Sequence, residues 1–111
     1  MTKVAVILCG SGYLDGSEIR ESVATLWALS QSRVNVECFA PDLSQKDVIN
    51  CYTNKPSLDE RRNMLVEAAR IARGNILPIS KLNASDFRAL IIPGGFGVAK
   101  NLCTFASEGA K

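Results

Sequence analysis

Short apolar runs that end at glycine or proline alternate along this chain with segments whose apolar residues recur at helical spacing. Three runs predict strands: residues 3–10 (KVAVILCG), 34–40 (VNVECFA) and 88–95 (RALIIPGG). The first of them, residues 3–10, is a continuous apolar run bounded by glycine, which is typical of a strand buried on both faces, as in parallel sheets. Residues 47–53 (DVINCYT) predict a short edge segment, and residues 75–87 predict a connection with some extended character.

A helix is predicted after the first strand. Asp15 stands three residues before Glu18, a pair that is similar to a capping box and would open the helix there. Ile19, Val23 and Trp27 then recur on one helical face, together with Leu26 and Ser30. Because this face is apolar, we expect Trp27 to lie in the core.

Two further helices are predicted. The capping box Ser57–Glu60 (SLDE) opens the second, which runs to about Arg73, and Gly74 supplies a left-handed stop. Its narrow packing face would consist of Leu65, Ala68, Ala69 and Ala72. Residues 97–107 (GVAKNLCTFAS) predict a short helix after the glycine loop.

The alternation of strands and helices predicts the fold class: an α/β, right-handed, doubly wound parallel sheet of the flavodoxin-like kind, with helices on both faces. Three parallel strands are few for such a sheet. Nothing after the last helix would cover the exposed strand edge. We therefore expect an incomplete domain, the first half of something larger.

Composition excludes several classes of function. The 111 residues allow one domain, and 47 % apolar with 22 % charged residues is an ordinary globular balance. The net charge is +2 and basic residues alternate with acidic ones, which argues against a nucleic-acid partner. No apolar run is long enough to span a membrane. The first apolar run leads into glycines and predicts a strand rather than a signal peptide, so the expected compartment is the cytoplasm.

The chain contains four cysteines, at positions 9, 38, 51 and 103, and no histidine. No pair has C-x-x-C spacing, so neither a zinc site nor another metal site is expected, and a disulfide framework is not expected either. Cys9 and Cys38 are interpreted as small buried strand residues. Without histidine, the chain lacks the usual general base.

Three segments would meet where the parallel strands end: residues 9–18, 40–42 and 93–97. Gly10, Gly12 and Gly16 invite a dinucleotide-binding interpretation, but their spacing is one residue too long for the fingerprint. Asp15 and Glu18 would also place negative charge where the pyrophosphate should lie. A phosphate-binding loop of the G-x-x-x-x-G-K-[ST] type is absent from the sequence.

Glu18, Gly94 and Gly95 are the candidate site residues, and each has two interpretations. Glu18 is either an acid that the helix dipole favours in the first turn, or an acid that tunes a neighbouring nucleophile. The two glycines either form a simple turn or present backbone N–H groups to a developing oxyanion.

A resemblance decides between these interpretations. The chain resembles the first half of the PfpI-like branch of the class I glutamine amidotransferase-like superfamily, and more narrowly the ElbB-type glyoxalases, also called enhancing lycopene biosynthesis or sigma cross-reacting proteins. The segments that carry it are VILCGSGYLDGSEIRES, CFAPD, DVIN, RNMLVEAARIARG and ALIIPGGFGVAKNL, in this order over nearly all of the chain. The resemblance implies that residues 1–111 are the N-terminal half of one domain.

The resemblance also assigns roles. It implies that Glu18 hydrogen-bonds the catalytic cysteine, and that the Gly94 and Gly95 amides face that cysteine as oxyanion-type donors. Gly97, Lys100 and Asn101 would be structural. The nucleophile itself would stand on a strand-to-helix elbow in the second half, and none of the four cysteines matches it. Cys9 is a weak substitute, because it precedes the turn rather than standing on it.

The function implied is that of a cofactor-independent glyoxalase, a lyase-type enzyme that converts glyoxal to glycolate and is associated with isoprenoid biosynthesis. Its expected partners are a small aldehyde, the missing C-terminal half and further copies in a homo-oligomer; neither cofactor, nucleic acid nor membrane is implied. The 111 residues alone should be inactive. Two alternatives stay open: a non-catalytic regulatory or binding member, and a true glutamine amidotransferase whose Cys-His-Glu triad would lie later in the chain.

Overall fold

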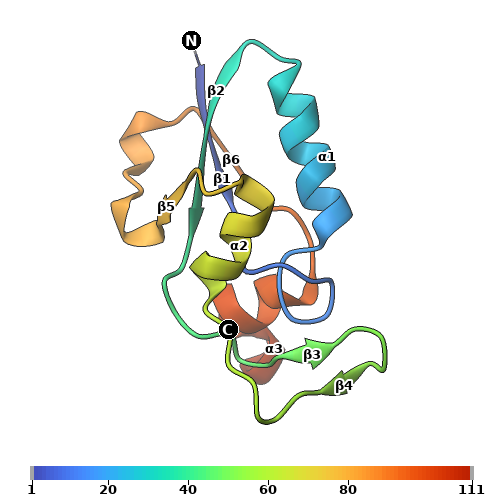
Figure 1. Ribbon diagram of the computed structural model, residues 1–111. Coiled ribbons are helices and arrows are strands. Elements are labelled where there is room, and N and C mark those ends of the chain that lie inside the picture. Colours follow the sequence, from blue (N-terminus) through green and yellow to red (C-terminus); the bar gives the residue numbers. More distant parts are fainter. Residues whose placement is uncertain (1, 111) are drawn as a thin grey trace.

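One four-stranded parallel sheet forms the centre of the structure, a computed structural model that describes residues 2–110. The strands are β1 (Thr2–Ile7), β2 (Val34–Ala40), β5 (Ile76–Pro78) and β6 (Ala89–Ile91), in the order β5-β2-β1-β6 (Figure 1). All neighbours in this sheet pair in parallel. The predicted fold class is confirmed, and β5 adds a fourth strand inside the segment expected to be a connection.

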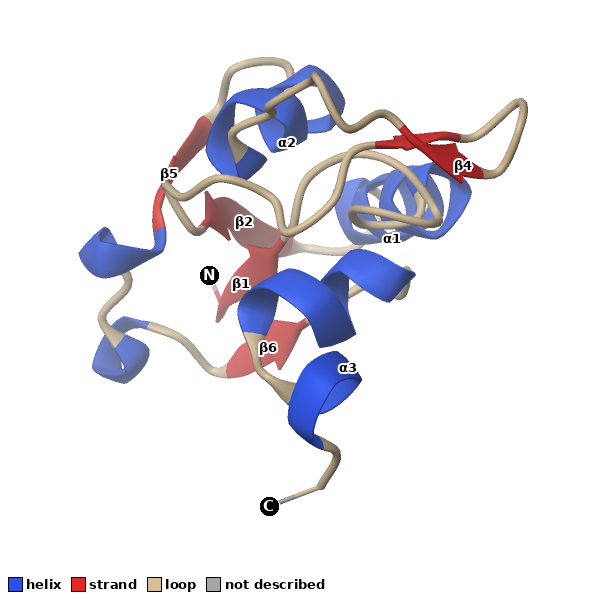
Figure 2. Ribbon diagram, turned by 90° about the horizontal axis from the view of Figure 1, so that it is seen from below, coloured by secondary structure: helices blue, strands red, loops and turns tan. Residues whose placement is uncertain are grey.

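Helical segments cover both faces of the sheet, as the view in Figure 2 shows. Two helices, α1 (Ile19–Ser30) and α2 (Met64–Ala72), lie side by side on one face. The other face is covered by the 3₁₀ turns η1 (Ile79–Lys81) and η2 (Ala84–Asp86) and by the π-helix η3 (Val98–Leu102). A last short helix, α3 (Phe105–Glu108), follows η3.

The core follows the alternation of side chains along and just beyond β1. Val6 and Leu8 point toward α1 and α2, where Leu26 of α1 packs against them. Ile7 and Cys9 point to the opposite face, where Val98 and Leu102 of η3 pack against their cluster. Because successive strand residues face opposite sides, a strand with helices on both sides must be apolar at every position. The continuous apolar run predicted this arrangement correctly.

A small antiparallel hairpin separates β2 from α2. It consists of β3 (Ile49–Asn50) and β4 (Lys55–Pro56) and lies at the same end of the molecule as α3 (Figure 1). Asp15 holds its base, since Asp15 Oδ2 accepts a hydrogen bond from the Ile49 N–H over 2.8 Å. Of the predicted edge segment 47–53, only Ile49 and Asn50 form a strand.

Two predictions for α1 are wrong. Asp15 does not cap the helix, because it is buried and bonded to the hairpin. Glu18 is the N-cap, and its Oε2 accepts from the Glu21 N–H over 2.6 Å. The inward face contains Ser22, which is fully buried, whereas Trp27 is 67 % exposed. Ser22 tolerates burial because its hydroxyl donates to the Glu18 carbonyl over 2.7 Å.

The start of α2 also differs from the prediction. Asn63, not Ser57, is the N-cap, and its side-chain oxygen accepts from the Val66 N–H over 3.0 Å. The helix ends as expected near Arg73, but Arg73 itself adopts the left-handed conformation, with φ 56°, and Gly74 follows with φ 79°. Ala68 of the predicted packing face is fully buried.

Both edge strands of the sheet, β5 and β6, have a single partner within the described residues, and β6 is the more exposed of the two at its centre. β6 pairs only with β1 there, and Leu90 at its centre is 56 % exposed. An apolar, unpaired parallel edge strand is unusual in a finished α/β sheet, because such sheets bury their strands.

Candidate functional site

The loops after β1 and β6 meet at the carboxyl end of the sheet. The chain runs from β1 to β2 and β5 on one side and places β6 on the other, so the strand order reverses between β1 and β6. Ligands of open parallel sheets bind at such a reversal. Three backbone hydrogen bonds join the loops: Glu18 N–H to Gly94 O (2.7 Å), Phe96 N–H to Tyr13 O (3.0 Å) and Gly97 N–H to Gly16 O (2.9 Å).

The glycines of the second loop are required by this close approach. A Cβ on Gly97 would lie 2.3 Å from the Gly16 Cα, and a Cβ on Gly95 would lie 2.4 Å from the Gly16 carbonyl oxygen. Gly95 also has φ +125°, a conformation that side chains disfavour. Backbone packs directly on backbone here, so the glycines do more than form a turn.

Glu18 lies half-buried at the start of α1, beside this contact. Its carboxylate accepts from the Glu21 N–H, and its own N–H donates to the Gly94 carbonyl. The sequence therefore placed Glu18 and the glycine loop together correctly, although the predicted catalytic roles of Glu18, Gly94 and Gly95 stay predictions. A carboxylate at this position also satisfies a free N–H of the first helical turn.

Glu21 is a site residue that the sequence reasoning missed. Its Oε1 accepts from the Gly94 N–H over 3.2 Å, so one of the two predicted oxyanion donors is engaged by a carboxylate. The Gly95 N–H makes no hydrogen bond to the described residues. Spacing in the sequence could have identified Glu21, because it lies three residues after Glu18 and therefore on the same side of the helix.

These groups surround a pocket of about 350 Å³, lined by Tyr13, Glu18, Glu21, Gly95 and Phe96. Two acidic residues, the backbone of the glycine loop and two aromatic residues from different loops thus line one space. The Tyr13 hydroxyl donates to Asn54 Oδ1 over 3.0 Å, which ties the pocket to the tip of the β3–β4 hairpin. Such a pocket can bind a small molecule and move a proton at it.

Asn101 and Lys100 fasten the surrounding loops. The Asn101 amide donates to the carbonyls of Asp15 (2.9 Å) and Cys9 (3.4 Å), and its oxygen accepts from the Lys46 N–H (2.9 Å). Lys100 donates to the Leu14 carbonyl over 2.9 Å and forms an ion pair with Asp47. These contacts fit the structural role predicted for both residues.

None of the chain's four cysteines lines the pocket. Cys9 and Cys38 are buried, as predicted, and Cys51 and Cys103 are exposed. Burial raises the pKa of the Cys9 thiol to about 11 and also raises that of Cys38. The Cys9 thiol is also fully buried, so neither its pKa nor its exposure suits a nucleophile.

The start of α1 does not suit a dinucleotide. The Glu18 carboxylate occupies the helix N-terminus that a pyrophosphate would need, and Glu21 adds a second negative charge. Within residues 2–110 no group of three or more cysteine, aspartate or glutamate side chains is arranged to hold a metal ion. No described helix is long and apolar enough to cross a membrane.

Curated proteins with similar sequences are amidotransferase-like. The chain is 50 % identical over 107 residues to the human "glutamine amidotransferase-like class 1 domain-containing protein 3, mitochondrial". It is also 50 % identical to the rat "ES1 protein homolog, mitochondrial" and 38 % identical to the zebrafish "ES1 protein, mitochondrial". These matches cover 96–97 % of the chain but only 40–42 % of the relatives. No protein-family model matches the chain.

A solved structure gives the same result. The chain superposes with a TM-score of 0.92 and 44 % identity on the crystal structure of an isoprenoid biosynthesis protein with an amidotransferase-like domain from Ehrlichia chaffeensis. The match covers 99 % of this chain and 51 % of that one, so the chain spans about half of its structural neighbour's length. The relatives' names place those three proteins in mitochondria and leave the cytoplasmic prediction for this chain unconfirmed. The homologues of this chain are glutamine amidotransferase-like class 1 domain proteins, and its fold is that of an amidotransferase-like domain.

Proposed function

We propose that this chain supplies half of the active site of a cofactor-independent, glyoxalase-like enzyme that converts a small aldehyde to a hydroxy acid. The observation that carries the proposal is the pocket that Glu18 and Gly95 both line, together with a Gly95 N–H that makes no hydrogen bond to the described residues. A carboxylate and an available backbone donor are the two groups that addition to an aldehyde needs from this side of a site.

The nucleophile would come from polypeptide beyond the 111 residues. We propose that residues 1–111 are the N-terminal half of one PfpI-like domain and that the second half adds strands to β6. Two observations support this: β6 is the edge strand whose following loop lines the pocket, and the chain spans 40–51 % of the proteins it resembles. In an extended sheet, a strand-to-helix elbow beside β6 would end at the same edge as the pocket.

In the proposed reaction, a cysteine thiolate adds to one aldehyde carbon of glyoxal, and the carbonyl becomes an alkoxide. The Gly95 N–H stabilises that oxygen. A hydride then moves to the neighbouring aldehyde carbon, so that the first carbon is oxidised to a thioester and the second is reduced to an alcohol. Water cleaves the thioester and releases glycolate and the thiolate. Glyoxal and water are the only reagents consumed.

Glu18 would hold the proton that the thiol loses and deliver it to the new alcohol. Its fixed position as a helix N-cap suits this role, since a group held in place loses little freedom when it acts. Glu21 must release the Gly94 N–H before that amide can serve as a second donor.

Glycolate formation from glyoxal by the full-length protein tests the proposal. Glu18→Gln should lower kcat by about 100-fold, the range expected for loss of a general acid–base group. Asp59→Asn, an exposed acid outside the pocket, is the matched control and should stay within about twofold. Full activity of Glu18→Gln would refute the proton role, while an inactive native protein would refute the enzyme.

A non-catalytic regulatory or binding member is the second candidate, and the Glu21 carboxylate favours it because it occupies the Gly94 N–H, one of the two predicted oxyanion donors. It predicts no glycolate and no iodoacetamide-sensitive turnover in the full-length protein. An inactive protein that still binds small aldehydes saturably would support it.

Context and assembly are further parts of the proposal. The Ehrlichia chaffeensis neighbour is an isoprenoid biosynthesis protein, and we propose the same association for this chain. We also propose a cytoplasmic homo-oligomer. Cell fractionation tests the compartment, and mitochondrial recovery would overturn it. Sedimentation equilibrium of the full-length protein tests the oligomer, and a monomer at micromolar concentration would overturn it.

A further inference from the structure

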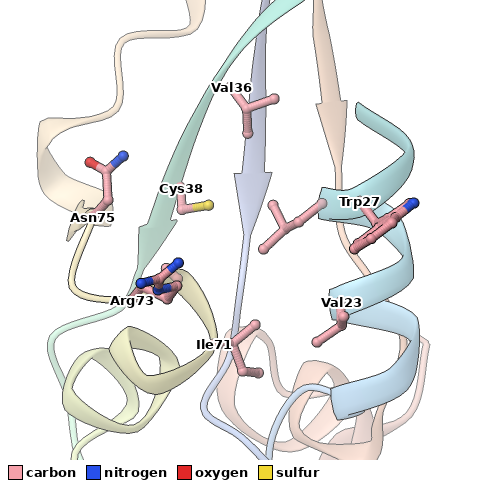
Figure 3. Close-up of a pocket in the computed structure, with 9 residues that line it drawn as sticks. Val23, Trp27, Val36, Cys38, Ile71, Arg73 and Asn75 are labelled. Carbon is pink, nitrogen blue, oxygen red and sulfur yellow. The ribbon is translucent and has the colours of Figure 1, made fainter. Parts of the chain in front are cut away.

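A second pocket lies between α1 and α2, and it shares no lining residue with the site described above. It has a volume of about 360 Å³, within the range of small-molecule sites. Val36 and Cys38 of β2 form its floor, while Val23 and Trp27 of α1 stand on one side of it (Figure 3). Its walls are therefore almost entirely apolar.

The polar residues of this pocket gather on one side. Arg73 and Asn75 follow the end of α2 and lie opposite Trp27 in Figure 3. Arg73 is the only charged residue that lines the pocket, and it makes no ion pair within residues 2–110. The pocket thus combines an apolar interior with a single unpaired positive charge at its rim.

The backbone at Arg73 adds an independent observation. The residue has φ 56°, the left-handed conformation that helix C-terminal positions usually assign to glycine or asparagine. Gly74 follows directly, so a helix that ended one residue later would have placed a glycine in this conformation. Residues kept in such a conformation against their preference tend to mark sites of function.

Trp27 supports the same conclusion from the other side of the pocket. It is 67 % exposed and Val23 is 48 % exposed, although the helical pattern predicts both in the core. Exposed large apolar side chains at the rim of a concave apolar surface indicate a binding region.

We propose that the pocket between α1 and α2 binds a monomeric amphiphile, an apolar chain that carries a carboxylate or phosphate. The apolar chain lies over Val36 and Cys38 and beneath Trp27, and the anionic group pairs with the Arg73 guanidinium. Charge complementarity selects this ligand over a neutral or cationic one, because no carboxylate lines the pocket. This site is independent of the proposed aldehyde chemistry.

Trp27 is the only tryptophan among the 111 residues, so its fluorescence reports on the pocket directly. The full-length protein is titrated with dodecanoate, dodecyl phosphate, dodecan-1-ol and dodecyltrimethylammonium below their micelle concentrations, and the Trp27→Phe variant provides the background. We expect a saturable change with both anions, at least tenfold weaker binding of the alcohol and none of the cation. The stronger of the two anions identifies the head group.

Arg73→Gly is the decisive variant, because glycine accepts the left-handed backbone and preserves the helix end. It should weaken both anions at least tenfold and leave the alcohol unchanged. Arg70→Gln, on α2 but outside the pocket, is the matched control and should bind like the native protein.

Three results would overturn the proposal. Anion, alcohol and cation could bind equally, Arg73→Gly could leave anion binding unchanged, or Trp27 could already be shielded from acrylamide in the ligand-free protein. In the last case, sedimentation equilibrium then tells whether a second copy or the remaining polypeptide covers this face.

Discussion

The Gly94 N–H donates to Glu21 Oε1 over 3.2 Å and joins two residues that lie 73 positions apart in the chain. The contact closes the β6 loop onto the first turn of α1. It also places a carboxylate oxygen against a backbone donor predicted to stabilise an oxyanion. The Glu21 carboxylate therefore helps three backbone hydrogen bonds to hold the loop in position.

Glu21→Ala should remove the hydrogen bond at the Gly94 N–H and let this part of the loop open more often. Loss of a hydrogen bond worth about 1 kcal/mol corresponds to about fivefold faster opening, and therefore to faster exchange of the Gly94 amide. Hydrogen exchange followed by NMR measures it. Glu21→Gln keeps an oxygen acceptor and should give a smaller effect, while the Gly97 amide, bonded to Gly16, should not change. Equal exchange at Gly94 in all three proteins would contradict the contact.

Gly97→Ala should be strongly destabilising. The new Cβ would lie 2.3 Å from the Gly16 Cα, where backbone meets backbone and neither side can move aside. We expect the free energy of unfolding to fall by about 3 kcal/mol or more, measured by urea denaturation. Gly74→Ala is the control, since nothing lies within 4 Å of its Cβ position and only the left-handed backbone opposes it. It should cost about 1 kcal/mol.

The two candidate caps of α2 can be separated by mutation. Asn63→Ala removes an acceptor for the Val66 N–H and a donor to Asp42, and should cost about 1–2 kcal/mol in urea denaturation. Ser57→Ala should change stability by less than about 0.5 kcal/mol, because the helix begins seven residues later, at Met64. If Ser57→Ala were instead the more destabilising of the two substitutions, Ser57 would be the N-cap, as the sequence pattern predicts. Asn63→Ser keeps the capping oxygen and should recover part of the loss.

The sequence predicted the parallel sheet because its signal is local: β1 lies in one continuous apolar run that ends at Gly10, and β2 is rich in β-branched and apolar residues and ends just before Pro41. It missed β5 (Ile76–Pro78), which is only three residues long and gains its place by pairing with β2. β6 is equally short, but it lies in an apolar run that ends at Pro93 and two glycines, whereas no glycine marks the end of β5.

The sequence also predicted the wrong inward face for α1, because the deciding contact is not visible in the apolar pattern. Apolar periodicity selects the face with Val23 and Trp27, but the helix turns Ser22 inward, where Glu18 satisfies its hydroxyl. A buried serine with a local partner costs little, and periodicity cannot detect that partner. At the candidate site, Glu18 and the glycine loop were predictable from spacing at strand ends. The bond from Gly94 to Glu21 was not, because it depends on how two distant loops approach each other.

Cys9 should make stability depend on alkaline pH. Burial raises the pKa of its thiol from 9.0 to about 11. Between these values the unfolded chain has released the proton while the folded protein keeps it, so the free energy of unfolding falls as pH rises. Two pKa units correspond to at most about 2.7 kcal/mol, and the raised pKa of Cys38 acts in the same direction. Urea denaturation at pH 8 and pH 10.5 should therefore show a larger loss for the native protein than for Cys9→Ala, which lacks this proton. Equal losses in the two proteins would mean that the Cys9 thiol titrates normally and is not buried in solution.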